Sequence, residues 1–332
     1  MNTTKNIWLQ RKSKWVICYK IGGNMKYNNI SIVIPFYNDK YIIDCIESLI
    51  IQKYPCNFYE IIVVDNNSEE SYLSLLDKYK DKIKLIHQQK RGSYHCRNLG
   101  TFYAKGNILA FTDSDCVIEP GWLEKINKFF STHDESFVAV QGQSFSFGGT
   151  EVATAIAEMY VDTFQTYVNN EQQGRFCSRL DTRNCAIRYD AFREIGLFHE
   201  EMLYWADAEF GMRLCEKGYK IQYLPKMNIR HHDIDNLELY LRKRQKEGKN
   251  VADMLWKAGA KYVRKYYPEM LFLFIIKRKS KEKYTQVLSD CMEKLESYKK
   301  CSEKQQKVQC IKTMSSSFFM LGILEALGKQ GG

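Results

Sequence analysis

Short apolar runs alternate with amphipathic segments over the first two hundred residues of the chain. The runs are rich in Ile, Val and Phe, which favours strands, and they occupy residues 30–35, 60–65, 83–87, 108–113 and 137–142. Between them, apolar residues recur at helical spacing over residues 39–52, 70–80, 96–104 and 121–131. This alternation is typical of βαβ units, so we expect an α/β, Rossmann-like fold with a mostly parallel sheet flanked by helices.

The pattern changes after Thr150. Two helical segments cover residues 151–170 and 204–218, and two strands are expected at residues 219–225 and 228–232. From Asp235 onward the chain is almost wholly helical, and its last part reads as two amphipathic helices divided near residues 301–307. No run reaches the roughly 18–20 apolar residues of a membrane span, so we expect the final helix to pack on the body of the protein or on a partner.

These patterns divide the chain into three parts. Residues 1–24 form an N-terminal extension that need not be ordered and that is either an addition to the fold or a misassigned start. Residues 25–234 form the α/β domain, and residues 235–332 form a mainly helical C-terminal region. Eleven cysteines without a C-x-x-C pair, and a basic leader without the apolar run of a signal peptide, favour a reducing compartment and a cytoplasmic location.

The positive charge of the chain is concentrated in one segment. Residues 240–283, here called the basic segment, contain fourteen Lys or Arg and four Asp or Glu, which equals the whole formal excess of +10. Such a segment serves an anionic membrane surface, an anionic substrate or solubility alone. We expect a packed helical extension with solvated charges, and the alternative is peripheral contact with the inner face of a membrane.

Candidate chemistry begins at Asp113-Ser114-Asp115, which ends the strand expected at residues 108–113. Two carboxylates on one side of a strand end repel each other unless a cation lies between them, although an isolated D-S-D is also an ordinary turn. Polar residues follow three other expected strands, at residues 35–38, 65–68 and 90–93. The carboxyl ends of parallel strands share one rim, where ligands bind, so the convergence favours a magnesium or manganese site.

With these motifs in order, the sequence resembles the family 2 glycosyltransferases of the GT-A fold. The resemblance runs from Ser31 to His232, and the last hundred residues match no family pattern. The motifs that carry it are SIVIPFYND, EIIVVDNNS, RGSYHCRNLG, LAFTDSDC, PGWLE, NCAIRYDAFREIGLF, YWADAEFGMRLCEKGY and YLPKMNIRHH.

The resemblance implies a nucleotide-sugar site. Asp65 corresponds to the carboxylate that contacts the nucleotide base, and Pro35 and Tyr37 match the loop that lies against the base. Arg91 and Arg97 fall where positive charge can meet the nucleotide or its phosphates. Each residue also has an ordinary interpretation, as a helix N-cap for Asp65, a strand end for Pro35 and exposed surface for the two arginines.

The resemblance also implies a divalent cation, Mn²⁺ or Mg²⁺. Asp115 corresponds to the direct metal ligand, and Asp113 to its companion, which belongs both to the metal site and to the nucleotide-sugar site near the ribose and sugar, with Ser114 between them in the nucleotide-sugar site. His231 is implied as a further ligand at the end of a strand. His232 should face the opposite way, and the alternative is a surface histidine pair.

Asp207 corresponds to the general base that takes the proton of an attacking hydroxyl. The family usually has Glu before this Asp, whereas this chain has Ala206, and His199 replaces another common Asp, so we expect an unusual acceptor site. Glu209 is the rival base, but two residues along a helix it should face away from Asp207.

Together these features predict an inverting, metal-dependent glycosyltransferase that uses a nucleotide sugar, for which we expect a UDP-sugar, and a glycan, lipid-linked glycan or peptide acceptor. One rival is a nucleotidyltransferase on a similar sheet, which predicts a Gly-rich phosphate loop that the first strand lacks. Another is a non-catalytic binder that uses the basic helical tail on lipid or nucleic acid. We do not expect nucleic-acid binding, because neither rival explains four motifs on one rim.

Overall fold

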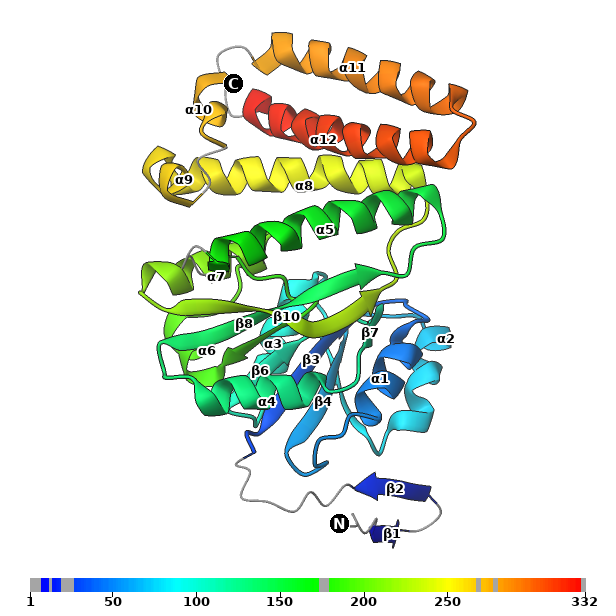
Figure 1. Cartoon of the computed structure of the whole chain (residues 1–332), viewed down its shortest axis with the longest axis vertical. Helices are drawn as coiled ribbons and strands as arrows, with labels where there is room; N and C mark the ends of the chain where they lie inside the picture. The colour runs from blue at the N-terminus through cyan, green and yellow to red at the C-terminus, as the bar shows by residue number, and fades with distance from the viewer. Residues whose placement is uncertain are drawn as a thin grey trace.

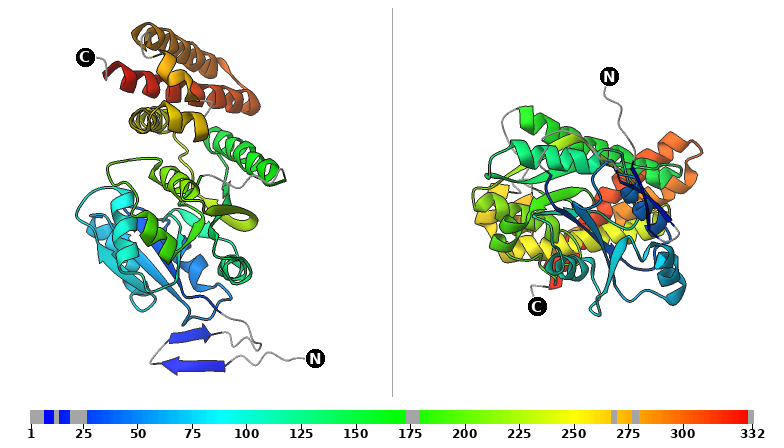
Figure 2. Two further views of the ribbon diagram at one scale, coloured as in Figure 1. Left: turned by 90° about the vertical axis from the view of Figure 1, so that its left-hand side faces the viewer. Right: turned by 90° about the horizontal axis from the view of Figure 1, so that it is seen from below.

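The structure, a computed structural model, describes residues 7–11, 14–18, 27–172, 179–266, 270–276 and 280–329. An open sheet with its covering helices forms one part of the molecule, and a stack of long helices forms the other (Figure 1). The β1–β2 hairpin lies at the end of the molecule opposite the helical stack, as Figure 1 and the left view of Figure 2 show.

Ten strands are present in the described part of the chain. They are β1 (Ile7–Arg11), β2 (Lys14–Cys18), β3 (Ile30–Phe36), β4 (Tyr59–Asp65), β5 (Ile83–His87), β6 (Ile108–Phe111), β7 (Cys116–Ile118), β8 (Phe137–Ser146), β9 (Cys185–Arg188) and β10 (Lys220–His231).

The helices are distributed over both parts. They are α1 (Ile42–Ile50), α2 (Glu70–Leu73), the 3₁₀ helix η1 (Ser74–Tyr79), α3 (Ser93–Phe102), α4 (Trp122–Thr132), α5 (Glu151–Gln172), α6 (Tyr189–Ile195), α7 (Ala206–Glu216), α8 (Leu237–Ala258), α9 (Ala260–Tyr266), α10 (Phe272–Ile276), α11 (Ser280–Lys300) and α12 (Lys304–Lys329).

The main sheet has eight strands in the order β5-β4-β3-β6-β9-β8-β10-β7. Strands β5, β4, β3 and β6 are mutually parallel, and β10 is parallel to β8. Strand β9 runs antiparallel between β6 and β8, and β7 runs antiparallel to β10. The predicted α/β fold is confirmed, and the four parallel strands bring their carboxyl ends to one edge of the sheet.

Helices cover both faces of the sheet because the strand residues alternate between two cores. On one face, Ile32 and Ile34 of β3 pack with residues of α1 and α4. On the other face, Val33 of the same strand packs with residues of α3, α6 and α7. Two buried faces explain why these strands read as continuous apolar runs.

Two segments differ from the sequence expectation. Residues 70–80 form one α-helical turn and then η1, in which the buried Leu76 and Tyr79 are three residues apart, matching the three-residue repeat of a 3₁₀ helix. The two strands expected at residues 219–225 and 228–232 are one strand, β10, with a register shift between Leu224 and Asn228 that allows Pro225 within it.

The C-terminal helices pack against each other and against α5. Helices α8 and α12 cross at two glycines, where a Cβ on Gly248 would lie 1.9 Å from the Phe319 carbonyl oxygen and one on Gly322 would lie 1.8 Å from that of Gln245. By length and composition, residues 304–328 of α12 could cross a membrane, contrary to the expectation from the sequence. However, 56% of the tested window is buried inside the protein, as in a core helix.

Candidate functional site

The loops that follow the parallel strands are joined by hydrogen bonds at the carboxyl edge of the sheet. The Ser114 hydroxyl donates to Asp39 Oδ2 at 2.6 Å, which connects the loops after β6 and β3. The Asn66 side-chain amide donates to the carbonyls of Gln88 and Lys90, which connects the loops after β4 and β5. The structure therefore brings the four polar loops to one rim, as the topology predicted.

Asp115 and His231 meet at this rim through the pairing of β7 with β10. His231 lies opposite Cys116 in the antiparallel register, and its Nε2 is 3.2 Å from Asp115 Oδ1. Its Nδ1 is 2.8 Å from Asp233 Oδ1. Ile229 and His231 are buried whereas Arg230 is exposed, as strand alternation requires.

The two acidic neighbours control the charge of this histidine. Burial alone would lower the pKa of His231, but the adjacent Asp115 and Asp233 carboxylates outweigh it and raise the pKa to about 9. Burial likewise opposes ionisation of Asp115, yet His231 holds the pKa of that carboxyl below its ordinary value. An imidazolium thus compensates the carboxylates in the metal-free protein.

The residues present fit a divalent cation. The ligand atoms of Asp115, Cys116 and His231 lie within 4.8 Å of one another. Cys116 is fully buried, and burial raises the pKa of its thiol well above the ordinary range, so the sulfur stays protonated. Because Mg²⁺ and Mn²⁺ prefer hard oxygen ligands to a thiol, Asp115 is the main candidate ligand, and the imidazole nitrogen of His231 is the second ligand atom beside it.

The carboxylate of Asp113 is held by a different partner. It forms an ion pair with the guanidinium of Arg97 on α3, whose side chain is only 5% exposed. The structure therefore places Asp113 outside the Asp115–His231 group and uses Arg97 to neutralise it. The predicted roles of both residues, and that of Ser114, toward the nucleotide sugar stay predictions.

The residues predicted to contact the base surround the ends of β3 and β4. The pairing of β3 with β6 ends at Val33 and Phe111. Pro35 lies beyond this pair, so its missing N–H removes no hydrogen bond to β6. Tyr37 is 47% exposed, and the Arg91 guanidinium lies 3.5 Å from its ring centroid. Together they form an exposed aromatic and cationic surface at the rim.

Asp65 is buried at the end of β4. Its Oδ1 accepts the backbone N–H of Ser68 at 3.0 Å, and its Oδ2 lies 3.2 Å from Nδ1 of His87. The carboxylate therefore stabilises its own loop, but it is not the N-cap of α2, which is Glu69. Its predicted contact with the nucleotide base is untested.

Asp207 lies in the first turn of α7. Its carboxylate accepts hydrogen bonds from the Tyr94 hydroxyl at 3.0 Å and from the Thr182 N–H at 2.9 Å. Burial, and then the charge of Asp181, raise the pKa of Asp207 above its ordinary value. The rival Glu209 is engaged instead by Arg213, at 2.9 Å, on the next turn of the same helix.

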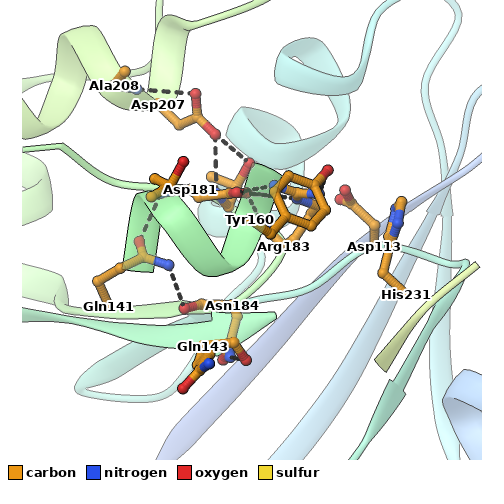
Figure 3. Close-up of polar contacts among 12 residues, drawn as sticks. Asp113, Gln141, Gln143, Tyr160, Asp181, Arg183, Asn184, Asp207, Ala208 and His231 are labelled. Atoms are coloured by element: carbon orange, nitrogen blue, oxygen red, sulfur yellow. Dashed lines mark hydrogen bonds and ion pairs between the residues drawn. The ribbon is translucent and has the colours of Figure 1, made fainter. Parts of the chain in front are cut away.

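The site contains a partly buried ion pair, between Arg183 and Asp181, that was not expected from the sequence. The Arg183 guanidinium donates to both carboxylate oxygens of Asp181 and to the Tyr160 hydroxyl. Figure 3 places Arg183 and Tyr160 between Asp207 and the Asp113 and His231 side chains. Although burial opposes ionisation, Arg183 lowers the pKa of Asp181 to about 2. The two charges flanking Thr182 were the only signal in the sequence.

Two further features were also missed. The positive charge of Lys243 on α8, in the basic segment, helps to lower the pKa of Asp115. The ring of His232 is stacked between those of Tyr41 and Phe147, with 3.8 Å and 4.1 Å between ring centroids. This three-ring stack fixes the chain directly after His231.

The fold is shared with a solved glycosyltransferase. The mannosyltransferase PcManGT from Pyrobaculum calidifontis, solved in complex with GDP-Man and Mn²⁺, superposes with a TM-score of 0.65 at 14% sequence identity, covering 92% of this chain and 88% of that chain. This similarity confirms the GT-A fold and its helical C-terminal region.

Sequence comparisons identify the family. Glycosyltransferase AglE of Haloferax volcanii is 29% identical over 201 residues, which are 58% of this chain and 64% of AglE. Glycosyltransferase GlyG of Streptococcus pneumoniae is 30% identical over 114 residues, 33% of this chain and 37% of GlyG. The matched regions thus span less than two thirds of these relatives. The family described as Glycosyl transferase family 2 matches residues 31–196, half of the chain, and the chain therefore belongs to that family.

Proposed function

We propose that this chain transfers a sugar from a nucleoside-diphosphate sugar to a hydroxyl acceptor, with inversion at the anomeric carbon and dependence on a divalent cation. The observation that carries the proposal is the convergence of Asp115 and His231 at the rim of the sheet, beside the loops after β3 and β4. Family membership supplies the reaction class.

The donor site is assigned to the rim. Tyr37 and Arg91 offer an exposed face for the nucleotide base, and Asp115 and His231 would hold the cation. When bound, the cation neutralises charge on the diphosphate leaving group. Lys243 and Arg183 add positive charge close to Asp115.

Asp207 is assigned the role of general base on the acceptor side. Its raised pKa suits proton transfer, because a carboxylate with a raised pKa holds an abstracted proton more strongly. A hydroxyl deprotonated there attacks the anomeric carbon in one displacement, and the carbon–oxygen bond to the diphosphate breaks as the new bond forms. A single displacement inverts the anomeric centre.

The nucleotide is proposed to be uridine, as the sequence resemblance implied, and guanosine is the second candidate because the PcManGT structure contains GDP-Man. A panel of UDP- and GDP-sugars, each incubated with the chain and Mn²⁺, tests both. We expect one donor to release free nucleotide slowly to water without any acceptor. If no nucleotide sugar is hydrolysed or bound, the proposed activity is wrong.

A further inference from the structure

The carboxylate of Asp233 is a buried group that the proposed mechanism does not use. Asp233 follows the end of β10 by two residues, and its side chain is only 3% exposed. Its Oδ1 lies 2.8 Å from Nδ1 of His231, and its Oδ2 is buried without a hydrogen-bond partner in the described part of the chain. Burying a carboxylate costs several kcal/mol unless its partner compensates it, so this arrangement requires an explanation.

The contact distinguishes the two nitrogens of His231. The imidazolium of the metal-free protein must lose one proton to bind a cation, and a ring that keeps its Nδ1–H on a carboxylate loses the proton of Nε2, which leaves the lone pair there. Nε2 is the nitrogen that faces Asp115, at 3.2 Å. Nε2 of His231 and Oδ1 of Asp115 thus face the same position, where a cation can bind. The Asp233 carboxylate lies on the other side of the imidazole ring, at Nδ1.

We infer that Asp233 is a positioning residue for the metal site, which orients the His231 ring and directs Nε2 to the cation beside Asp115. This inference rests on the proposed metal dependence. A carboxylate behind a ligating histidine fixes the ring and its tautomer and makes the nitrogen more basic, and removing such a partner typically weakens metal affinity by about 10–100-fold.

The backbone around His231 is held independently of Asp233. His231 is paired with Cys116 across the sheet, the N–H of His232 donates to the Asp115 carbonyl at 2.9 Å, and the His232 ring is stacked between Tyr41 and Phe147. Removing the Asp233 carboxylate should therefore release the imidazole ring without displacing the strand.

The test measures metal binding directly in the full chain. Titration of Mn²⁺, followed by the electron paramagnetic resonance signal of the free ion, is carried out alone and with UDP or GDP. The variants are Asp233→Ala, Asp233→Asn and His231→Ala, with Asp235→Asn as the matched control because Asp235 is exposed two residues further on. Circular dichroism verifies that each variant is folded.

We expect Asp233→Ala to weaken Mn²⁺ binding at least tenfold and Asp233→Asn to weaken it less, because the amide oxygen still accepts the Nδ1–H. Asp235→Asn should bind as the wild type does. Electron spin-echo modulation from a ligating ¹⁴N should be present in the wild type, absent in His231→Ala and lost or reduced in Asp233→Ala. If Asp233→Ala does not fold, Mn²⁺ binding is compared between Asp233→Asn and the wild type instead.

The outcomes separate this inference from the proposed function. Wild-type affinity and unchanged ¹⁴N modulation in the Asp233 variants would overturn the positioning role alone, because the metal site would still exist. A wild-type chain that binds no Mn²⁺ under any of these conditions would overturn the metal dependence itself, and the positioning role with it.

Discussion

The Oδ2 atom of Asp207 accepts two hydrogen bonds from Thr182, one from its backbone N–H at 2.9 Å and one from its hydroxyl at 3.0 Å. Thr182 belongs to the loop before β9, so the contact fixes the start of α7 to the middle of the sheet. Asp207 is therefore oriented by residues that do not belong to its own helix.

Replacing Asp207 by Asn should lower kcat by about 10²–10⁴-fold while donor affinity stays close to that of the wild type, because the amide cannot take a proton. The amide also loses an acceptor for Thr182 or Tyr94, which should cost about 1–3 kcal/mol of stability. Calorimetry with the donor, below the unfolding temperature, separates the two effects. Glu209→Gln is the control and should retain turnover. Loss of donor binding in Asp207→Asn would instead make Asp207 a binding residue.

The raised pKa of Asp207 predicts the pH dependence of the reaction. A general base works only when deprotonated, so kcat/KM should fall as the pH drops through the raised pKa, and this decline should begin above the ordinary value of 3.8. The profile is measured over the range in which the protein stays folded. A profile that is flat down to the ordinary aspartate range would show that Asp207 is not the base.

Gly322→Ala should destabilise the helical region. Its new Cβ would meet the Gln245 carbonyl at 1.8 Å, and backbone atoms cannot rotate away, so α8 and α12 must separate. Such overpacking costs about 1–3 kcal/mol and lowers Tm. Gly328→Ala in the same helix is the control, because its Cβ meets no atom within 4 Å, and it should leave Tm unchanged or raise it. Equal Tm values for both variants would contradict the close crossing.

If the acceptor is lipid-linked, the basic segment should hold the chain at an anionic membrane surface. Arg242, Arg244 and Lys249 are paired with acidic residues, and residues 277–279 lie outside the described part of the chain. The chain should float with anionic liposomes at low salt and dissociate as ionic strength rises, since each basic residue contributes about 1 kcal/mol near such lipids. Changing Lys277, Arg278, Lys279 and Lys281 to Gln should weaken flotation without altering donor hydrolysis. Absence of flotation at low salt would favour a soluble acceptor.

The sequence predicted the sheet where runs of Ile and Val are long enough to identify a strand. It did not identify β7, which has three residues, or β9, which has four within the NCAIR motif. The motif order identified Asp115 and His231 as candidates, but their contact depends on the pairing of β7 with β10. Asp181, Arg183 and Asp233 were not identified because an isolated charged residue in a loop gives no sign that the fold will place it beside a partner of opposite charge.

The Asp115 carboxylate tests the central claim most directly. Release of nucleotide from the donor identified by the panel is measured with Mn²⁺, with EDTA, and with Mn²⁺ restored, for the wild type and for Asp115→Ala. We expect EDTA to abolish the wild-type reaction, Mn²⁺ to restore it, and Asp115→Ala to be at least about 100-fold slower at an unchanged fold, because about 3 kcal/mol of charge stabilisation is lost. Full wild-type activity in EDTA, or a fully active Asp115→Ala chain, would contradict the account.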